Sequence, residues 1–86
     1  MSNENSLNSD GRAAHYLPHC ETLRTHAGES INELARQSEV DRGTIKKIER
    51  GHPVTAPIVH RVFSILNEWH NGKLNISSEI KNLPKR

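Results

Sequence analysis

The sequence contains little material for a large hydrophobic core and none for a disulfide framework. Of its 86 residues, 33% are hydrophobic and 3% aromatic, with Tyr16, Phe63 and Trp69 as the whole aromatic set. A β-sandwich draws heavily on aromatic and β-branched residues, so this composition favours small helices. The single cysteine, Cys20, has no partner for a disulfide or for a cysteine-based zinc site. One unpaired cysteine is typical of a reducing compartment, which predicts a cytoplasmic protein.

Long hydrophobic runs are also missing. No stretch approaches the about 18 apolar residues that a membrane-spanning helix needs. Residues 1–12 lack the basic start and apolar centre of a signal peptide and consist almost entirely of small polar and acidic residues. We therefore expect a flexible N-terminal arm over residues 1–14, one small domain over residues 15–70 and a C-terminal tail over residues 71–86.

The sequence carries no motif of a catalytic or metal centre. It has no glycine-rich phosphate loop, no HExxH motif and no serine or cysteine nucleophile in a recognisable setting. His15 and His19 are four residues apart, a spacing that suits metal binding on a helix, but Pro18 lies between them and no carboxylate cluster accompanies them. We expect no enzymatic activity, no metal and no cofactor.

Helix start and stop signals predict two short helices before residue 40. Pro18 suits the first turn of a helix that ends at Gly28. Ser30 and Glu33 have the spacing of a capping box, in which the serine oxygen accepts a hydrogen bond from a free amide and the glutamate reaches back. A second helix is therefore expected to begin directly after Ser30.

A third helix is predicted in the segment RGTIKKIERG, residues 42–51, after Asp41 as its capping residue and with Gly51 at its end. On a helical wheel, Ile45 and Ile48 lie on one side. The opposite arc is rich in positive charge and contains Arg42, Gly43, Lys46, Lys47 and Arg50. Helices two and three would be joined by about three residues, which is the spacing of a helix-turn-helix.

The remaining pattern predicts a long apolar helix and a short one. Thr55 can cap a fourth helix with Pro57 in its first turn. Its apolar residues recur at helical spacing: Ile58, Val59, Val62, Phe63, Ile65, Leu66 and Trp69. After a turn at Asn71-Gly72, Ser77 or Ser78 can cap a last short helix containing Ile80 and Leu83. The predicted fold class is all-α, a compact four- to five-helix bundle.

The pattern ELAxxxxVxxxTIxxIExG, preceded by LRxxxG, covers about half of the chain. Its residues are Leu23, Arg24, Gly28, Glu33, Leu34, Ala35, Val40, Thr44, Ile45, Ile48, Glu49 and Gly51. Residues 23–66 thereby resemble the Xre/Cro-type helix-turn-helix family, also called lambda-repressor-like DNA-binding domains. The resemblance implies a bacterial or phage-encoded, nucleoid-associated regulator of transcription that binds double-stranded DNA, with the helix at residues 42–50 in the major groove.

Family roles can be transferred residue by residue. The resemblance implies that Arg24 and Glu49 form a structural ion pair. The residues expected to contact bases are Arg42, Gly43, Lys46 and Lys47, with Asp41 and Thr44 at the margin. Among them, the Arg42 guanidinium suits guanine O6 and N7, whereas Gly43 can only bring the backbone close. The residues expected to contact phosphates are Arg50, His52, Thr55 and Ala56.

The sequence departs from the family pattern at Glu39, where the family usually has a left-handed glycine, and at Ile31, where a glutamine often touches phosphate. Glu39, Gly43 and the wide apolar arc of the fourth helix support an alternative hypothesis. In that alternative, the protein is an antitoxin or phage-type accessory protein that acts by binding a partner protein, such as a toxin, through the fourth helix and the tail.

We also expect a homodimer, because one such domain reads only a few base pairs and paired domains read two half-sites. The residues predicted for its interface are apolar and lie in the fourth helix and the tail: Val59, Phe63, Trp69, Leu74, Ile76 and Ile80.

Overall fold

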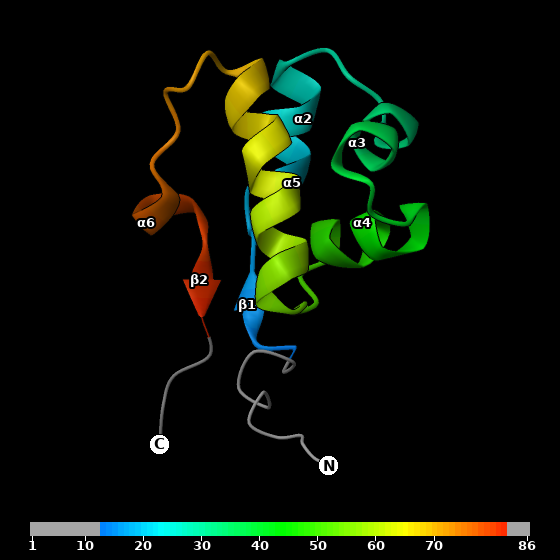
Figure 1. Ribbon diagram of the computed structural model, residues 1–86, viewed down its shortest axis with the longest axis vertical. Helices are drawn as coiled ribbons and strands as arrows, with labels where there is room; N and C mark the ends of the chain where they lie inside the picture. The colour runs from blue at the N-terminus through cyan, green and yellow to red at the C-terminus, as the bar shows by residue number, and fades with distance from the viewer. Residues whose placement is uncertain (1–12, 83–86) are drawn as a thin grey trace.

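Five helices and two short strands form the part of the chain that the computed structural model describes, residues 13–82 (Figure 1). In chain order they are β1 (His15–Tyr16), α2 (Cys20–His26), α3 (Ile31–Ser38), α4 (Arg42–Glu49), α5 (Ala56–Trp69), α6 (Ile76–Glu79) and β2 (Lys81–Asn82). The mainly helical fold agrees with the all-α prediction. The two-stranded sheet is an addition that the sequence pattern did not indicate.

Helix α5 occupies the centre of the fold, and α2 and α3 pack against it (Figure 1). Helix α4 packs against α3 and α2 at the edge of the molecule. The buried side chains of α5 are Val59, Val62, Phe63 and Leu66, which recur with helical spacing. Together with buried residues of the other segments they form one core: Leu17, Cys20, Leu34, Val40, Ile45, Ile48 and Val54.

Side-chain caps define the starts of α3 and α4. Ser30 Oγ accepts a hydrogen bond from the Glu33 amide at 3.0 Å, as predicted. The glutamate does not reach back to Ser30, because its carboxylate accepts hydrogen bonds from Arg36 and Gln37. The capping box is therefore only half formed. Asp41 Oδ2 accepts from the Gly43 amide at 2.8 Å, which caps α4.

Two other predicted helix starts differ in detail. Pro18 lies in a turn before α2 and not within its first turn, since the helix begins at Cys20. Thr55 does precede α5, but its side chain makes no capping hydrogen bond. Pro57, which has no amide hydrogen, removes one of the donors that a cap would otherwise need to satisfy.

The small sheet joins the beginning and the end of the described chain. β1 and β2 pair antiparallel, with His15 opposite Asn82 and Tyr16 opposite Lys81. On its other side, β1 is tied to the segment between α4 and α5. The His15 amide donates to the Val54 carbonyl at 2.9 Å, and the Val54 amide donates back at 2.8 Å. The segment after α4 is thus anchored to the chain ends.

The prediction for the tail was wrong in its boundaries. Helix α6 is capped by Asn75, whose Oδ1 accepts from the Ser77 amide at 2.8 Å, and not by either predicted serine. The helix ends before Ile80, which has an extended backbone. Residues 81–82 pair with β1 instead of continuing the helix, and Leu83 lies outside the described residues. Within residues 13–82, no helix has the length and apolarity that crossing a membrane requires.

Candidate nucleic-acid interface

Helices α3 and α4 are joined by three residues, 39–41. The first of them, Glu39, has a left-handed backbone with φ 59° and ψ 39°, so it takes the conformation for which glycine is usual at this position. The Arg61 guanidinium donates to the Glu39 carbonyl at 3.4 Å. Next to it, Val40 is buried and its amide donates to the Ala35 carbonyl at 3.1 Å. The turn is therefore fixed by the core on one side and by α5 on the other.

Helix α4 has two chemically distinct faces. Ile45 is fully buried and Ile48 is 2% exposed, so both anchor the helix to the core. The opposite face is solvent-exposed and, together with the C-cap residue, carries four cationic side chains: Arg42, Lys46, Lys47 and the C-cap Arg50. Burial of the two isoleucines is worth roughly 3 to 6 kcal/mol in total, at about 1.5–3 kcal/mol for each side chain. The orientation of the cationic face is consequently fixed by packing.

The positive charge of this face is not neutralised by neighbouring carboxylates. Within residues 13–82, none of the four cations forms an ion pair. The two acidic residues that flank the helix are engaged elsewhere: Asp41 caps the helix, and Glu49 pairs with Arg24. The four cations therefore have no ion-pair partner among residues 13–82, although Glu21 and Glu49 line the hollow that Lys46 and Arg50 also line.

The ion pair between Arg24 and Glu49, which the family resemblance implies, is present in the structure. Arg24 Nε donates to Glu49 Oε2 at 2.7 Å, and Nη2 donates to Oε1 at 3.1 Å. The carboxylate raises the pKa of Arg24 further above its usual value. A third hydrogen bond links Arg24 Nη1 to the Glu29 carbonyl at 2.9 Å. The pair holds the end of α4 against α2 and the start of α3.

The thiol of Cys20 lies beside this pair, with its sulfur 3.7 Å from Glu49 Oε2. The side chain is fully buried. Burial, and then the negative charge of Glu49, raises the pKa of the Cys20 thiol to about 12. The cysteine is therefore a protonated core residue and has no thiolate with which to react at neutral pH.

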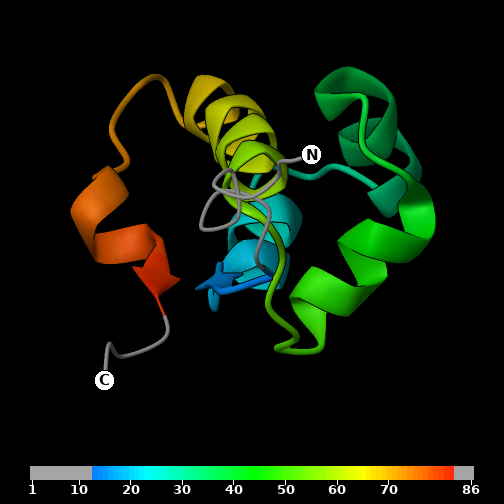
Figure 2. The same ribbon diagram turned by 60° about the horizontal axis from the view of Figure 1, so that its bottom comes forward.

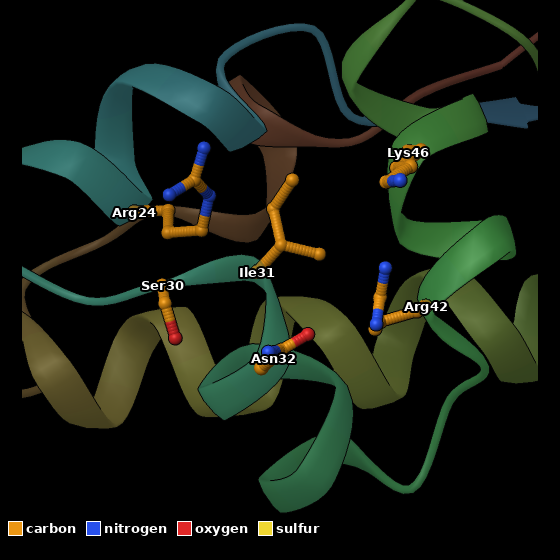
Figure 3. Close-up of a pocket in the computed structure, with 6 residues that line it drawn as sticks. All are labelled: Arg24, Ser30, Ile31, Asn32, Arg42 and Lys46. Carbon is orange, nitrogen blue, oxygen red and sulfur yellow. The ribbon is translucent and has the colours of Figure 1, made fainter.

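A shallow groove of about 310 Å³ lies between the beginning of α3 and the exposed face of α4 (Figure 3). It is lined by Arg24, Ser30, Ile31, Asn32, Arg42 and Lys46. Figure 3 shows Asn32 from α3 and Arg42 from α4 on opposite sides of the opening. A neighbouring hollow of about 260 Å³ shares Ile31 and Lys46 and extends to Arg50. Lys46 thus lines both hollows, with Arg42 in the first and Arg50 in the second.

Sequence reasoning did not identify Asn32 as part of this site. Its exposed amide follows Ile31, which is half-buried and packs against the core. Helical spacing could have indicated Asn32, because a side chain next to an inward-facing position in the first turn of a helix points toward the solvent. Ile31 itself offers no polar group, in keeping with its omission from the predicted contacts.

The presence of glycine at position 43 can be explained by a contact within the protein. A Cβ atom at this position would lie 2.9 Å from Asp41 Oδ2, which is closer than real Cβ contacts allow. A side chain here would therefore require the Asp41 carboxylate to shift from its capping position. The remaining predicted contacts are less exposed or lie after α4. Thr44, Thr55 and Ala56 are half-buried and His52 is exposed, and none of them lines the groove.

The predicted dimer residues divide into three groups. Val59 and Phe63 are part of the protomer's own core, 0% and 8% exposed, so neither is available to a partner. This corrects the prediction for both residues: the wide apolar arc of α5 is needed to cover α2 and α3. Trp69, Leu74 and Ile80 are half-buried against the core. Among residues 13–82, Ile76 is the one large hydrophobic residue that is exposed, at 46%.

In the described part of the chain, no three His, Cys, Asp or Glu side chains gather in a way that could hold a metal ion.

Comparisons of the chain with protein-family models, with curated proteins and with solved structures found no match in any of the three. The chemistry of the site is that of guanidinium and ammonium donors, which bind phosphate oxygens and the acceptor atoms of bases.

Proposed function

We propose that the protein binds double-stranded DNA in a sequence-specific manner, through a helix-turn-helix formed by α3 and α4. It would act as a small transcriptional regulator, repressor-like, by occupying an operator. The observation that carries the proposal is the exposed face of α4. This face holds four cations that no carboxylate of residues 13–82 neutralises, on a helix whose other face is locked into the core.

The dimensions of α4 fit this function. Its eight residues span about 12 Å, at 1.5 Å per residue. A helix of about 10–12 Å in diameter enters the major groove of B-DNA, which is about 12 Å wide. In this arrangement Arg42, Lys46 and Lys47 would reach base edges. Arg50 and His52 would contact the phosphate backbone, as would the start of α5 at Thr55 and Ala56.

Two copies would be needed to read a complete operator. A two-fold dimer presents two recognition helices to half-sites about 34–36 Å apart. Of the predicted interface residues, Ile76 is the one whose side chain is open to solvent in the protomer. Changing Ile76 to glutamate should therefore shift the protein toward monomer in light scattering and weaken operator binding. The same change at its exposed neighbour Ser77 should have a smaller effect. Equal effects of both changes would remove Ile76 from the interface.

A salt titration tests DNA binding directly. The probe is a fluorescent 20-base-pair duplex pool of random sequence, followed by anisotropy between about 50 and 200 mM salt. A protein with six to ten phosphate contacts should lose roughly 10³ to 10⁵ in affinity over this range. Weak binding that does not change with salt would contradict the proposal and favour recognition of a partner protein.

A charge-reversal pair provides the matched control. Lys47→Glu places a negative charge on the exposed face of α4, whereas Lys73→Glu makes the same change in the exposed segment between α5 and α6. Both alter the net charge equally. Only the change at Lys47 should abolish binding and reduce the salt slope. Equal losses for the two variants would show that overall charge, and not α4, determines the affinity.

A further inference from the structure

The exposed face of α4 contains hydrogen-bond donors almost exclusively, and this follows from how the acidic side chains are used. Glu49 is 8% exposed in its side chain and has both oxygens on Arg24. The Asp41 carboxylate is held against the backbone of α4 by the Gly43 amide. The cap uses Oδ2 and leaves Oδ1 able to accept a hydrogen bond at the N-terminal margin of the face. Arg42, Lys46 and Lys47 can only donate.

Donor-only side chains discriminate among the four base pairs. In the major groove, guanine presents two acceptors, O6 and N7, and no donor. Adenine presents one acceptor beside an amino donor, and cytosine presents an amino donor. Thymine presents one acceptor beside a methyl group. A surface of guanidinium and ammonium groups is therefore best satisfied by guanine.

The spacing of the donors adds a geometric condition. Arg42 and Lys46 line the same groove and are one helical turn apart (Figure 3). Four residues correspond to about 6 Å along the helix axis, whereas neighbouring bases on one strand are about 3.4 Å apart. With both side chains extended in the same direction, the bases that they reach are about two base-pair steps apart.

We propose that the site selects duplexes in which each half-site has two guanines within three consecutive base pairs, read by Arg42 and by Lys46. This inference rests on the proposed function. Asn32, on the opposite wall of the groove, is exposed and its side chain both donates and accepts, as does the hydroxyl of Ser30, which already caps α3. Asn32 would therefore add contacts to the backbone or to a flanking base without imposing guanine.

The experiment is a selection of bound sequences from a random duplex pool, at about 150 mM salt, with the full chain. The enriched sequences should share the guanine pair. Replacing either guanine by deazaguanine, which lacks the N7 acceptor, should weaken binding on the order of tenfold, within the range expected for a good base contact. Arg42→Ala should abolish the preference at one of the two positions and preserve it at the other. Lys73→Ala, remote from α4, should leave the selected sequence unchanged.

The outcomes separate this inference from the proposed function. Enriched sequences without a guanine pair would overturn the inference and leave DNA binding intact. So would a loss of less than about twofold on deazaguanine replacement. Salt-dependent binding with no enrichment would likewise overturn it while supporting a non-specific DNA-binding role. Failure to bind any duplex would overturn both.

Discussion

Arg24 holds both carboxylate oxygens of Glu49 in a pair that joins α2 to the end of α4, with 2.7 Å between Nε and Oε2. The side chains are only 12% and 8% exposed. Removing one partner from a pair this buried leaves an unpaired charge in a poorly solvated position. We expect Glu49→Ala to lower the free energy of unfolding by about 3 kcal/mol, measured by urea denaturation.

The double change Arg24→Met with Glu49→Leu is the control for this prediction. It removes both charges and keeps apolar volume between the helices, so most of the lost stability should return. If Glu49→Ala costs less than about 1 kcal/mol, the pair behaves as a surface ion pair and does not hold α4 in place.

The left-handed conformation of Glu39 stores strain in the turn between α3 and α4. An L-residue with a Cβ atom pays roughly 1–2 kcal/mol in this region, which glycine avoids. Glu39→Gly should therefore stabilise the protein by about 0.5–1 kcal/mol after the entropy that glycine loses on folding. In a thermal melt this corresponds to a rise of about 2–8 °C in Tm. Glu39→Ala retains the Cβ atom and should give little gain, and an equal gain would point to the removed charge instead.

The local features of the fold were the ones that sequence reasoning could predict. Ser30 and Asp41 accept hydrogen bonds from amides three and two residues away. Their caps can therefore be predicted from a short stretch of sequence. The inward position of Ile45 follows from helical periodicity alone. The cationic face of α4 follows from the same wheel, because its residues lie opposite the core.

The features that escaped prediction depend on contacts between distant segments. The pairing of His15 with Asn82 joins residues 67 positions apart and involves strands too short to show an alternating pattern. Phe63 is predicted at a dimer interface but is buried in the protomer's own core, because a helical wheel cannot show how many neighbours an apolar arc must cover. In the tail, Asn75 and two serines are all good capping residues, so the local sequence does not choose among them, and the pairing of residues 81–82 with β1 is a long-range contact.

The buried thiol of Cys20 predicts a specific loss of stability at alkaline pH. Its pKa rises from 9.0 to about 12 on folding. The protonated thiol is favoured in the folded state, so the stabilisation is complete below pH 9 and is lost as the pH rises toward 12. Above pH 9 the unfolded chain binds fewer protons than the folded one, and the free energy of unfolding should fall by up to about 1.4 kcal/mol per pH unit.

This effect can be isolated from the other groups that titrate at high pH. Urea denaturation at pH 8, 9 and 10 should show a steeper decline for the parent protein than for Cys20→Ala, which has no thiol to ionise. The folded protein should also resist modification by a thiol reagent at neutral pH and react only after unfolding, since the side chain is 0% exposed. Parallel pH dependences of the two proteins would contradict the assigned pKa.

Gly43 offers a test of whether its missing side chain serves the protein or its ligand. A Cβ atom there would meet Asp41 Oδ2 at 2.9 Å, so Gly43→Ala should displace the cap at a cost of about 1 kcal/mol. Alanine recovers a similar amount through its higher helix propensity, about 1 kcal/mol, and the net change in stability should be close to zero. In an Asp41→Ala background no cap remains to be lost. The same substitution should then stabilise by about 1 kcal/mol, which is measurable as coupling in a double-mutant cycle.

DNA affinity in the same four proteins distinguishes the two roles of Gly43. If the glycine only accommodates Asp41, alanine at position 43 should weaken DNA binding in the parent and leave it unchanged in the Asp41→Ala background, where the Cβ atom has no carboxylate to displace. If the glycine instead lets the backbone approach a base or phosphate closely, alanine should weaken binding by a similar factor in both backgrounds, because the methyl group then collides with the DNA. The change in stability reports the contact of the Cβ atom at position 43 with Asp41, and the change in affinity reports its contact with DNA. Measuring both therefore distinguishes the two roles of Gly43.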